Sequence, residues 1–160
     1  MPTAVDVRFN ELDPYGHVNH TVYLTYLEVA RVDLLAAHGV ELIDLATRTG
    51  AQLVVVGVEV DYLAPAVAGD RLTVTCEVVE RRRASVRFHQ TVRRGDRELV
   101  RARVRAAVLD ADGRPRALPE ALLAALEPVG GGVAGGTVGG SAGGASADIA
   151  RPSATSAATT

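Results

Sequence analysis

The sequence predicts an α+β domain in which one long helix packs against an antiparallel sheet. Two patterns support this fold class. After residue 19, apolar residues recur at steps of three and four, which is helical spacing, and later segments alternate apolar and polar residues, which is strand spacing. The connections between those strands are too short for crossover helices, so neighbouring strands run antiparallel. One strand, a long helix and then a run of strands is an α+β order.

The chain begins with a predicted strand and a long helix. Residues 4–9 alternate apolar and charged side chains, as a half-buried strand does. The helix is expected from about Asn19 to His38, because Gly39 suits the left-handed position that follows a helix. Its residues are apolar on nearly every face, and we therefore expect the rest of the domain to enclose it.

A sheet is predicted to follow a short helix at residues 41–50. Its strands are expected at Gln52–Leu63, Arg71–Arg81, Ala84–Arg93 and Glu98–Leu109. The first of these starts with a continuous apolar run, which implies cover on both faces, such as a helix beneath and a partner subunit beside it. Gly57 within it suggests a bulge or a close backbone approach. A last short helix is predicted at Leu118–Leu126.

Composition divides the chain into a folded domain, residues 1–128, and a tail, residues 129–160. The tail is dominated by Gly, Ala, Ser and Thr and is predicted to be disordered, because such residues bury too little surface to offset their entropy. The N-terminus has no basic and apolar regions of a signal peptide, and the apolar run at residues 53–58 is too short to span a bilayer. A soluble cytoplasmic protein without a membrane partner is expected.

Several kinds of chemistry are disfavoured by composition. A net charge of −2 argues against nucleic acid as a partner. The chain has no lysine, which excludes a Schiff-base or phosphate-loop lysine. Cys76 is the single cysteine, so no disulfide forms within the chain, and we interpret it as a small buried hydrophobe. Ser85 is the one serine of the folded part and lies mid-strand, away from any nucleophile elbow.

A polar loop before the long helix holds the candidate catalytic side chains Asp13, His17 and His20. The first N–H groups of a helix lack partners and its dipole favours negative charge, so this position can stabilise an oxyanion while a carboxylate attacks or activates water. Two other interpretations stay open. Asp13 and Asn19 can serve only as caps and turn formers, or Asp13 and the two histidines can bind a metal.

The loop and several later motifs resemble the signature of the 4-hydroxybenzoyl-CoA thioesterase family of hotdog-fold enzymes. The similar segments are residues 13–20 (DPYGHVNH), 23–24 (YL), 28–31 (EVAR), 60–65 (VDYLAP), 69–70 (GD) and 112–115 (DGRP). The resemblance implies a long helix wrapped by a curved antiparallel sheet. It also implies a homodimer or a dimer of dimers with sites at the subunit interface, and hydrolysis of an acyl-CoA or acyl-carrier-protein thioester.

The resemblance also implies roles for residues of the loop. Asp13 matches the catalytic carboxylate, acting as nucleophile or as base for water. The main-chain N–H of His20 is expected to donate to the thioester oxygen, with Gly16 allowing the tight approach, and His17 is expected to orient water or Asp13. Asn19 is expected to position the loop. No metal or organic cofactor is implied, since coenzyme A is part of the substrate.

Further residues are expected to contact substrate. Tyr15 and Tyr23 flank the catalytic positions of the loop. Arg81, Arg82 and Arg83, with Arg87 beyond them, lie where the family meets the phosphates of coenzyme A, although plain surface charge explains them as well.

Glu28 and Arg31 are spaced as a structural ion pair on the helix. Two alternative functions remain at this point. One is binding of acyl-CoA without turnover, and the other is hydration or dehydration of an acyl thioester on the same scaffold.

Overall fold

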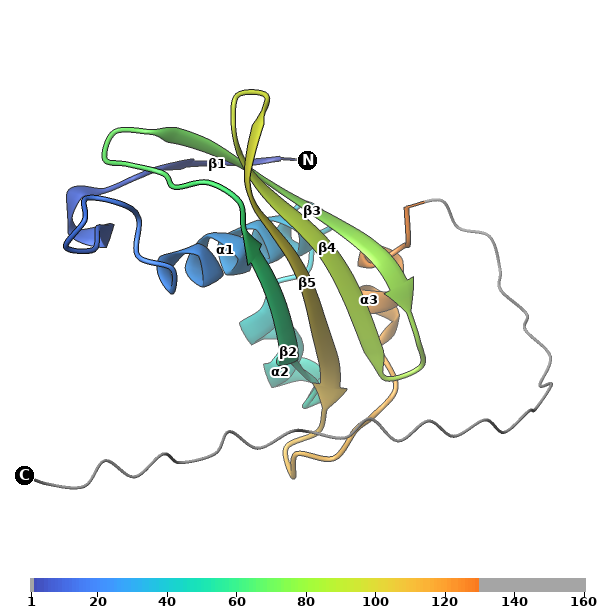
Figure 1. Ribbon diagram of the computed structural model, residues 1–160. Coiled ribbons are helices and arrows are strands. Elements are labelled where there is room, and N and C mark those ends of the chain that lie inside the picture. The colour runs from blue at the N-terminus through green and yellow to red at the C-terminus, as the bar shows by residue number, and fades with distance from the viewer. Residues whose placement is uncertain (1, 130–160) are drawn as a thin grey trace, which may run out of the picture.

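The computed structural model describes residues 2–129 and shows a curved antiparallel sheet wrapped around a central helix (Figure 1). Its elements are β1 (Thr3–Asp6), a 3₁₀ turn (Phe9–Glu11), α1 (Val22–Ala36), α2 (Leu42–Thr49), β2 (Gln52–Tyr62), β3 (Arg71–Arg81), β4 (Ser85–Arg94), β5 (Arg97–Leu109) and α3 (Glu120–Ala125). The α+β hotdog fold expected from the sequence is confirmed. The predicted disordered tail from residue 130 onward lies outside the described residues.

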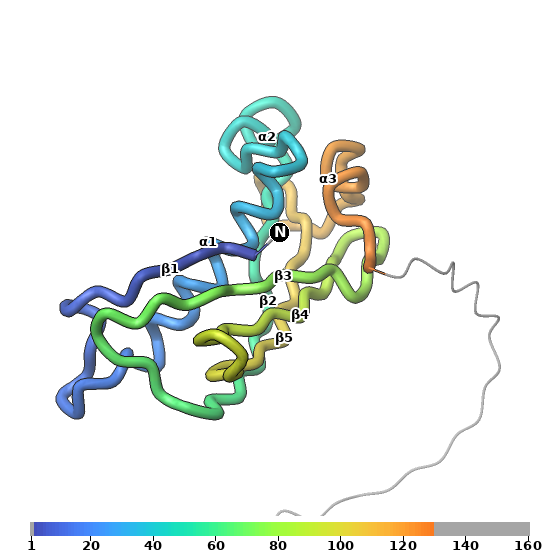
Figure 2. The backbone as a smooth tube through the Cα atoms, turned by 90° about the horizontal axis from the view of Figure 1, so that it is seen from above, coloured from blue at the N-terminus to red at the C-terminus, as the bar shows by residue number. Residues whose placement is uncertain are grey.

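The five strands are arranged in the order β1-β3-β4-β5-β2 and every neighbouring pair is antiparallel. Side chains alternate between the two faces: Ala102 and Val104 of β5 are buried against the core, whereas Arg101 and Arg103 point outward and are exposed. Figure 2 shows the α-helices of residues 2–129 on the same side of this sheet. The alternation is therefore what separates a helix-covered inner face from a charged outer face.

β2 lies at one edge of the sheet and pairs on its inner side with β5. The register shifts between Val55 and Gly57, so the bulge predicted at Gly57 is confirmed. Along this strand, Val55, Val56 and Val58 are 42%, 45% and 42% exposed. In the described part of the chain, this 11-residue strand with exposed apolar residues therefore has one edge without a neighbouring strand.

The helix α1 is buried on one side only. Its inward residues are Tyr23, Tyr26, Leu27, Ala30 and Leu35. Leu24, Val29 and Val32 are 41%, 40% and 40% exposed on the other side. The prediction of a helix enclosed on all sides is therefore wrong for the single chain, because one five-stranded sheet covers one side of a helix.

The start of α1 also differs from the sequence expectation. The helix begins at Val22, three residues after Asn19, because the Asn19 side chain accepts a hydrogen bond from the Thr21 N–H at 3.0 Å and holds a turn there. The helix ends at Ala36, two residues before the predicted His38, but Gly39 has the predicted left-handed conformation, with a φ of +74°. None of the helices in residues 2–129 has the length and apolar character that crossing a membrane requires.

Candidate active site

The loop before α1 folds into a tight turn that its own main chain closes. The Asp13 N–H donates to the His17 carbonyl at 2.7 Å, and the Gly16 N–H donates to the Asp13 carbonyl at 3.0 Å. Gly16 has a φ of +78°, a left-handed conformation that glycine adopts without strain. A Cβ at this position would meet no atom within 4 Å, so the turn requires glycine for its backbone angle and not for space.

Asp13 is half-buried and held by one of its two carboxylate oxygens. Oδ1 accepts hydrogen bonds from the main-chain N–H groups of Tyr15 at 2.8 Å and His17 at 3.1 Å. Within residues 2–129, Oδ2 has no hydrogen-bond partner. The carboxylate is therefore fixed in direction and keeps one oxygen free to attack a carbon or to take a proton from water.

His20 supplies a free main-chain donor at the start of α1. The neighbouring N–H groups are used: that of Asn19 donates to the Glu11 carbonyl at 2.9 Å, and that of Thr21 donates to the Asn19 side chain. The His20 N–H finds no acceptor in the described residues. It lies before the N-terminus of a 15-residue helix, where unpaired N–H groups and the helix dipole favour a negative charge.

Three tyrosines connect this loop to the rest of the fold. The Tyr26 hydroxyl donates to the Glu11 carboxylate at 2.6 Å, the Tyr23 hydroxyl accepts from the Ala66 N–H at 3.1 Å, and the Tyr62 hydroxyl donates to the His20 carbonyl at 2.9 Å. Burial, reinforced by the Glu11 carboxylate, raises the pKa of Tyr26, so this phenol stays a neutral donor.

The other residues predicted for the site have different surroundings. Tyr15 is 85% exposed, and the ring of His17 is exposed with no hydrogen-bond partner among residues 2–129. Asp13 and His17 are joined through the main chain of His17 and not through its imidazole. Tyr23 is 3% exposed, so it supports the loop from the core. Within the described residues, no three His, Cys, Asp or Glu side chains gather as metal ligands.

An apolar depression of about 270 Å³ lies between α1 and β2, beginning one helical turn beyond His20. Its lining residues are Leu24, Thr25, Leu27, Glu28, Arg31, Val55, Val58 and Val104. Depressions lined mainly by aliphatic side chains with a few polar groups suit an acyl chain. Two of its lining residues, Leu24 and Val55, are 41% and 42% exposed, so the depression is open to solvent.

The buried side-chain amide of Gln90 binds Arg31, one of the charged residues that line this depression. Gln90 is 0% exposed; its side chain donates to the Leu27 carbonyl and accepts from Arg31 Nη1, each at 2.8 Å. Burial lowers the pKa of the Arg31 guanidinium. The predicted ion pair between Glu28 and Arg31 is wrong: within the described residues, no salt bridge joins them, because the guanidinium turns to Gln90.

The arginines predicted to meet phosphates divide into two groups. Arg81 is engaged by α3: it donates to the Leu123 carbonyl and pairs with Glu127 at 2.9 Å. Arg82 and Arg87 both pair with Glu80, on the outer face of the sheet.

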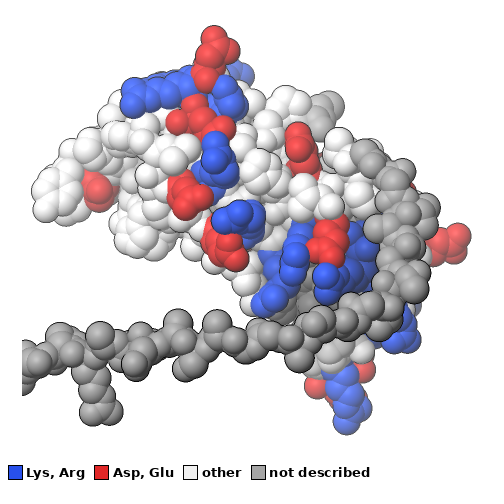
Figure 3. Space-filling view, turned by 45° about the vertical axis from the view of Figure 1, so that its right-hand side comes forward, with Lys and Arg blue, Asp and Glu red and all other residues white. Residues whose placement is uncertain are grey.

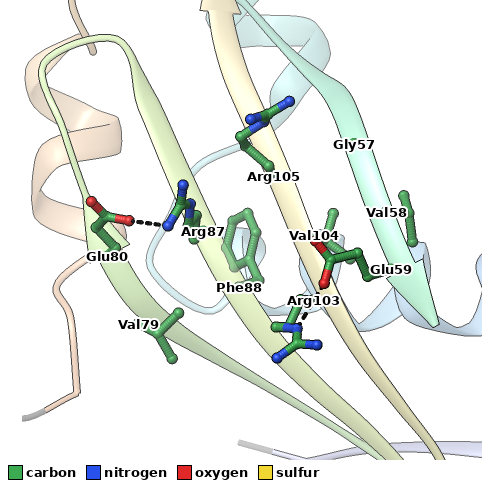
Figure 4. A pocket seen from close by; sticks show the side chains of 10 residues that line it. All are labelled: Gly57, Val58, Glu59, Val79, Glu80, Arg87, Phe88, Arg103, Val104 and Arg105. Carbon is green, nitrogen blue, oxygen red and sulfur yellow. Dashed lines mark hydrogen bonds and ion pairs between the residues drawn. The ribbon is translucent and has the colours of Figure 1, made fainter. Parts of the chain in front are cut away.

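A wide depression of about 890 Å³ opens beside Arg87 and includes Arg103 and Arg105 (Figure 4). Figure 3 shows a cluster of basic side chains on this part of the surface, with few acidic side chains among them. Arg103 pairs with Glu59 at 2.9 Å, so among the described residues Arg105 is the arginine of this depression without an acidic partner, whereas Arg81 is committed to the fold.

Sequence reasoning missed Tyr62 and Gln90 as parts of the site. Gln90 carried a signal, because it is a polar residue on the inward side of a strand, in phase with Phe88 and Val92. Tyr62 lies in the segment 60–65 that carried the family resemblance, but no local pattern connected it to His20, which is 42 residues away in the sequence.

Comparison with known proteins places this geometry in a family. A model of the thioesterase-like superfamily matches residues 7–126. Over 78 residues the chain is 38% identical to the long-chain acyl-CoA thioesterase FadM of Escherichia coli strain K12, a match that covers 49% of this chain and 58% of that protein.

The chain is also similar to solved structures of thioesterases. A thioesterase of Thermus thermophilus, complexed with coenzyme A and Zn, is 35% identical with a TM-score of 0.66, covering 78% of this chain and 90% of that chain. The probable thioesterase YbaW of Escherichia coli is 28% identical with a TM-score of 0.69, covering 79% and 99%. The family expected from the motifs is confirmed, and the chain belongs to the thioesterase-like superfamily.

Proposed function

We propose that this protein hydrolyses acyl-CoA thioesters to a free acid and coenzyme A. The observation that carries the proposal is the pairing, in one loop, of a carboxylate oxygen without a partner and a free main-chain N–H at the start of α1. The apolar depression between α1 and β2 offers space for an acyl chain next to them. The acyl-CoA thioesterase named among the relatives supports the same substrate class.

In this mechanism the thioester oxygen accepts a hydrogen bond from the His20 N–H. As the carbonyl carbon becomes tetrahedral, negative charge grows on that oxygen, and the N–H and the helix dipole stabilise it. Asp13 Oδ2 takes a proton from the attacking water, or attacks the carbon itself to form an anhydride that water then opens. In both routes the C–S bond breaks, the thiolate of coenzyme A leaves and is protonated, and no resident metal or organic cofactor takes part.

A second copy of the chain completes the site in this proposal. The depression between α1 and β2 lies beside the edge strand of the sheet, and Leu24 and Val55 leave apolar surface there. Pairing of two β2 edges would bury this surface and satisfy the open main-chain groups. The acyl group would then lie between two protomers.

We place the coenzyme A phosphates on Arg105 and Arg87 of the outer face, together with Arg82 and Arg83, which are exposed in the turn after β3. Tyr62, which contacts His20, and Gly57, which pairs with Arg105, are five residues apart along β2. The distance between the proposed oxyanion donor and the proposed phosphate site follows from this spacing. That is roughly 17 Å at the rise of a strand, within reach of a pantetheine arm. Arg81 is left out of this role, because its guanidinium is already bound to α3. A carrier protein, which presents the same arm, is the alternative donor.

The direct test is Asp13→Asn. The amide keeps an oxygen that can accept the Tyr15 and His17 N–H groups, so the turn is retained while the basic oxygen is lost. We expect kcat for thiol release from acyl-CoAs to fall on the order of 10²-fold or more, typical of losing a principal catalytic group. Thiol release over a panel of acyl-CoAs of different chain lengths is the measurement.

Asp112→Asn is the matched control, since this exposed carboxylate pairs only with the side chain of Arg114 among the described residues. It should keep full activity. Retention of activity within a few fold in Asp13→Asn would show the assignment to be wrong.

A wild type that releases no thiol but is thermally stabilised by acyl-CoA would instead be a binding protein. A change in enoyl absorbance without free thiol would indicate a hydratase.

A further inference from the structure

The side chain of Tyr62 connects the end of β2 to the residue that carries the free N–H. Its hydroxyl donates to the His20 carbonyl at 2.9 Å. Its ring meets the His20 ring edge-on with centroids 6.3 Å apart, and lies 5.8 Å from the ring of Tyr23, which is buried. The position of His20 is thus set from the sheet, across 42 residues of sequence.

His20 needs such an external contact because it lies between two structured segments. The loop before it ends with the Asn19 N–H bound to the Glu11 carbonyl, and α1 begins at Val22. The Leu24 N–H, which in a longer helix would bind the His20 carbonyl, donates to the Thr21 carbonyl at 3.1 Å. Among residues 2–129 the donor to the His20 carbonyl is the Tyr62 hydroxyl.

We propose that Tyr62 is a positioning residue for the reaction: its hydroxyl holds the His20 main chain so that the N–H stays directed at the thioester oxygen. This inference rests on the proposed hydrolysis and on the His20 N–H as oxyanion donor. A carbonyl fixed on one side limits rotation of the peptide groups on either side of the same Cα, and a preorganised donor needs no reorientation as charge develops.

The exposure of Tyr62 separates this role from a role in stability. The residue is 48% exposed, so water can replace its hydroxyl at the His20 carbonyl when the hydroxyl is removed. Folding then loses little, whereas a mobile water does not fix the peptide as a tyrosine anchored in the sheet does. The effect of removing the hydroxyl should therefore appear in the rate and hardly in the melting temperature.

The test is Tyr62→Phe, assayed on an acyl-CoA and on the dithioester in which C=S replaces the thioester C=O. Sulfur is a weak hydrogen-bond acceptor, so the dithioester gains little from the His20 N–H. We expect kcat/KM to fall roughly tenfold on the thioester, the equivalent of one hydrogen bond, and less than about twofold on the dithioester. The melting temperature should stay within about 2 °C of the wild type.

Tyr26→Phe is the matched control. It makes the same chemical change and removes a contact to the same loop, the 2.6 Å hydrogen bond to Glu11. Tyr26 is 3% exposed, so this variant should lose thermal stability and reduce the rates on both substrates by a common factor. If Tyr62→Phe also lowers both rates equally, or keeps the thioester rate within twofold, the positioning role is wrong.

A measurement without turnover separates this inference from the proposed hydrolysis. An acyl-CoA analogue with a methylene between carbonyl and sulfur presents the same oxygen and cannot be hydrolysed. In the wild type its binding should move the amide proton resonance of His20 downfield. In Tyr62→Phe the shift should be reduced and binding should be several-fold weaker.

If the wild type cleaves no thioester yet shows this shift and its loss, hydrolysis fails, while the part of the inference that Tyr62 orients the His20 N–H toward a bound carbonyl oxygen stands. If the wild type cleaves thioesters and Tyr62→Phe matches it in both measurements, the positioning role fails and hydrolysis stands.

Discussion

At the residue scale, burial decides the chemistry of the single thiol. Cys76 lies on the inward face of β3, as the strand pattern predicted, and is 9% exposed. Burial raises the pKa of this thiol to about 12, and the nearby Arg31 lowers it by less than burial raises it. The group is therefore a neutral thiol at physiological pH, unsuited to act as a nucleophile.

The raised pKa predicts a loss of stability in alkali. An unfolded Cys76 releases its proton above its ordinary pKa of 9.0, whereas the folded protein holds that proton until about pH 12. The free energy of unfolding should therefore fall as pH rises through this window, by up to about 2 kcal/mol at about pH 10.5. Urea denaturation of the wild type and of Cys76→Ala at about pH 8 and about pH 10.5 measures this.

The alanine variant leaves a cavity and should be less stable at both pH values, so the comparison lies in the pH dependence. Its stability should fall less between the two pH values than that of the wild type. The raised pKa of Tyr26 also lowers stability in alkali, but it does so equally in the wild type and in Cys76→Ala, so it cancels in the comparison of the two proteins. Equal losses in the two proteins would contradict the assignment to Cys76.

At the element scale, β4 and β5 bring two arginines directly opposite one another. Arg87 pairs with Arg105 in the register, and like charges at such positions are destabilising. Glu80 balances Arg87 at 2.9 Å. Arg105 instead extends over Gly57, where a Cβ would meet its Nη2 at 3.5 Å. Among residues 2–129 Arg105 has no acidic partner, so its guanidinium beside the open depression is suited to a bound phosphate.

Arg105→Gln should therefore weaken binding of acyl-CoA without slowing chemistry. We expect KM for acyl-CoA to rise about fivefold, the equivalent of one exposed charge-assisted contact, with kcat unchanged. KM for the matching acyl-pantetheine, which has no phosphate, should not change. Steady-state kinetics on the two substrates at low salt is the measurement.

Arg114→Gln provides the control, because this arginine is equally charged and exposed but pairs with Asp112 in the turn after β5. It should leave both KM values as they are. A rise in KM for acyl-pantetheine as well as for acyl-CoA in Arg105→Gln would show that the residue does not act through the phosphates.

At the scale of the whole molecule, the single chain leaves one apolar surface uncovered. The exposed side of α1 and the free edge of β2 meet at the depression to which Leu24 and Val55 both contribute. An apolar run in β2 and a helix apolar on both sides are costly in a monomer and favourable in a dimer. The surface is therefore the one we assign to a second copy.

Leu24→Arg combined with Val55→Arg should convert a dimer into a monomer, because it places two desolvated like charges in each half of a two-fold interface. Sedimentation velocity over a range of concentrations measures the change. Ile43→Arg is the control: Ile43 on α2 is 85% exposed and lies outside this depression, so its variant should stay dimeric. A monomeric wild type at high concentration would overturn the assignment.

Much of the fold was predictable because its signals are local. The bounds of β3 agree with the alternation of Arg71–Arg81, and the ends of α1 and α2 are marked by Gly39 and Gly50, both with positive φ. The position of the candidate site was likewise marked by the motif at residues 13–20. What failed was the enclosure of α1, since periodicity tells which faces are apolar and not what covers them.

By itself the sequence determined the α+β class, the strand order along the chain, the position of the candidate catalytic loop and the superfamily. Only the tertiary structure decided that Tyr62 holds His20 and that Arg31 turns to Gln90 and not to Glu28. These contacts join residues 42 and 59 positions apart. Strand register and helix placement bring these residues together, and the hydrogen-bonding needs of single groups, such as the buried amide of Gln90, then decide the partner in a way that no local pattern encodes.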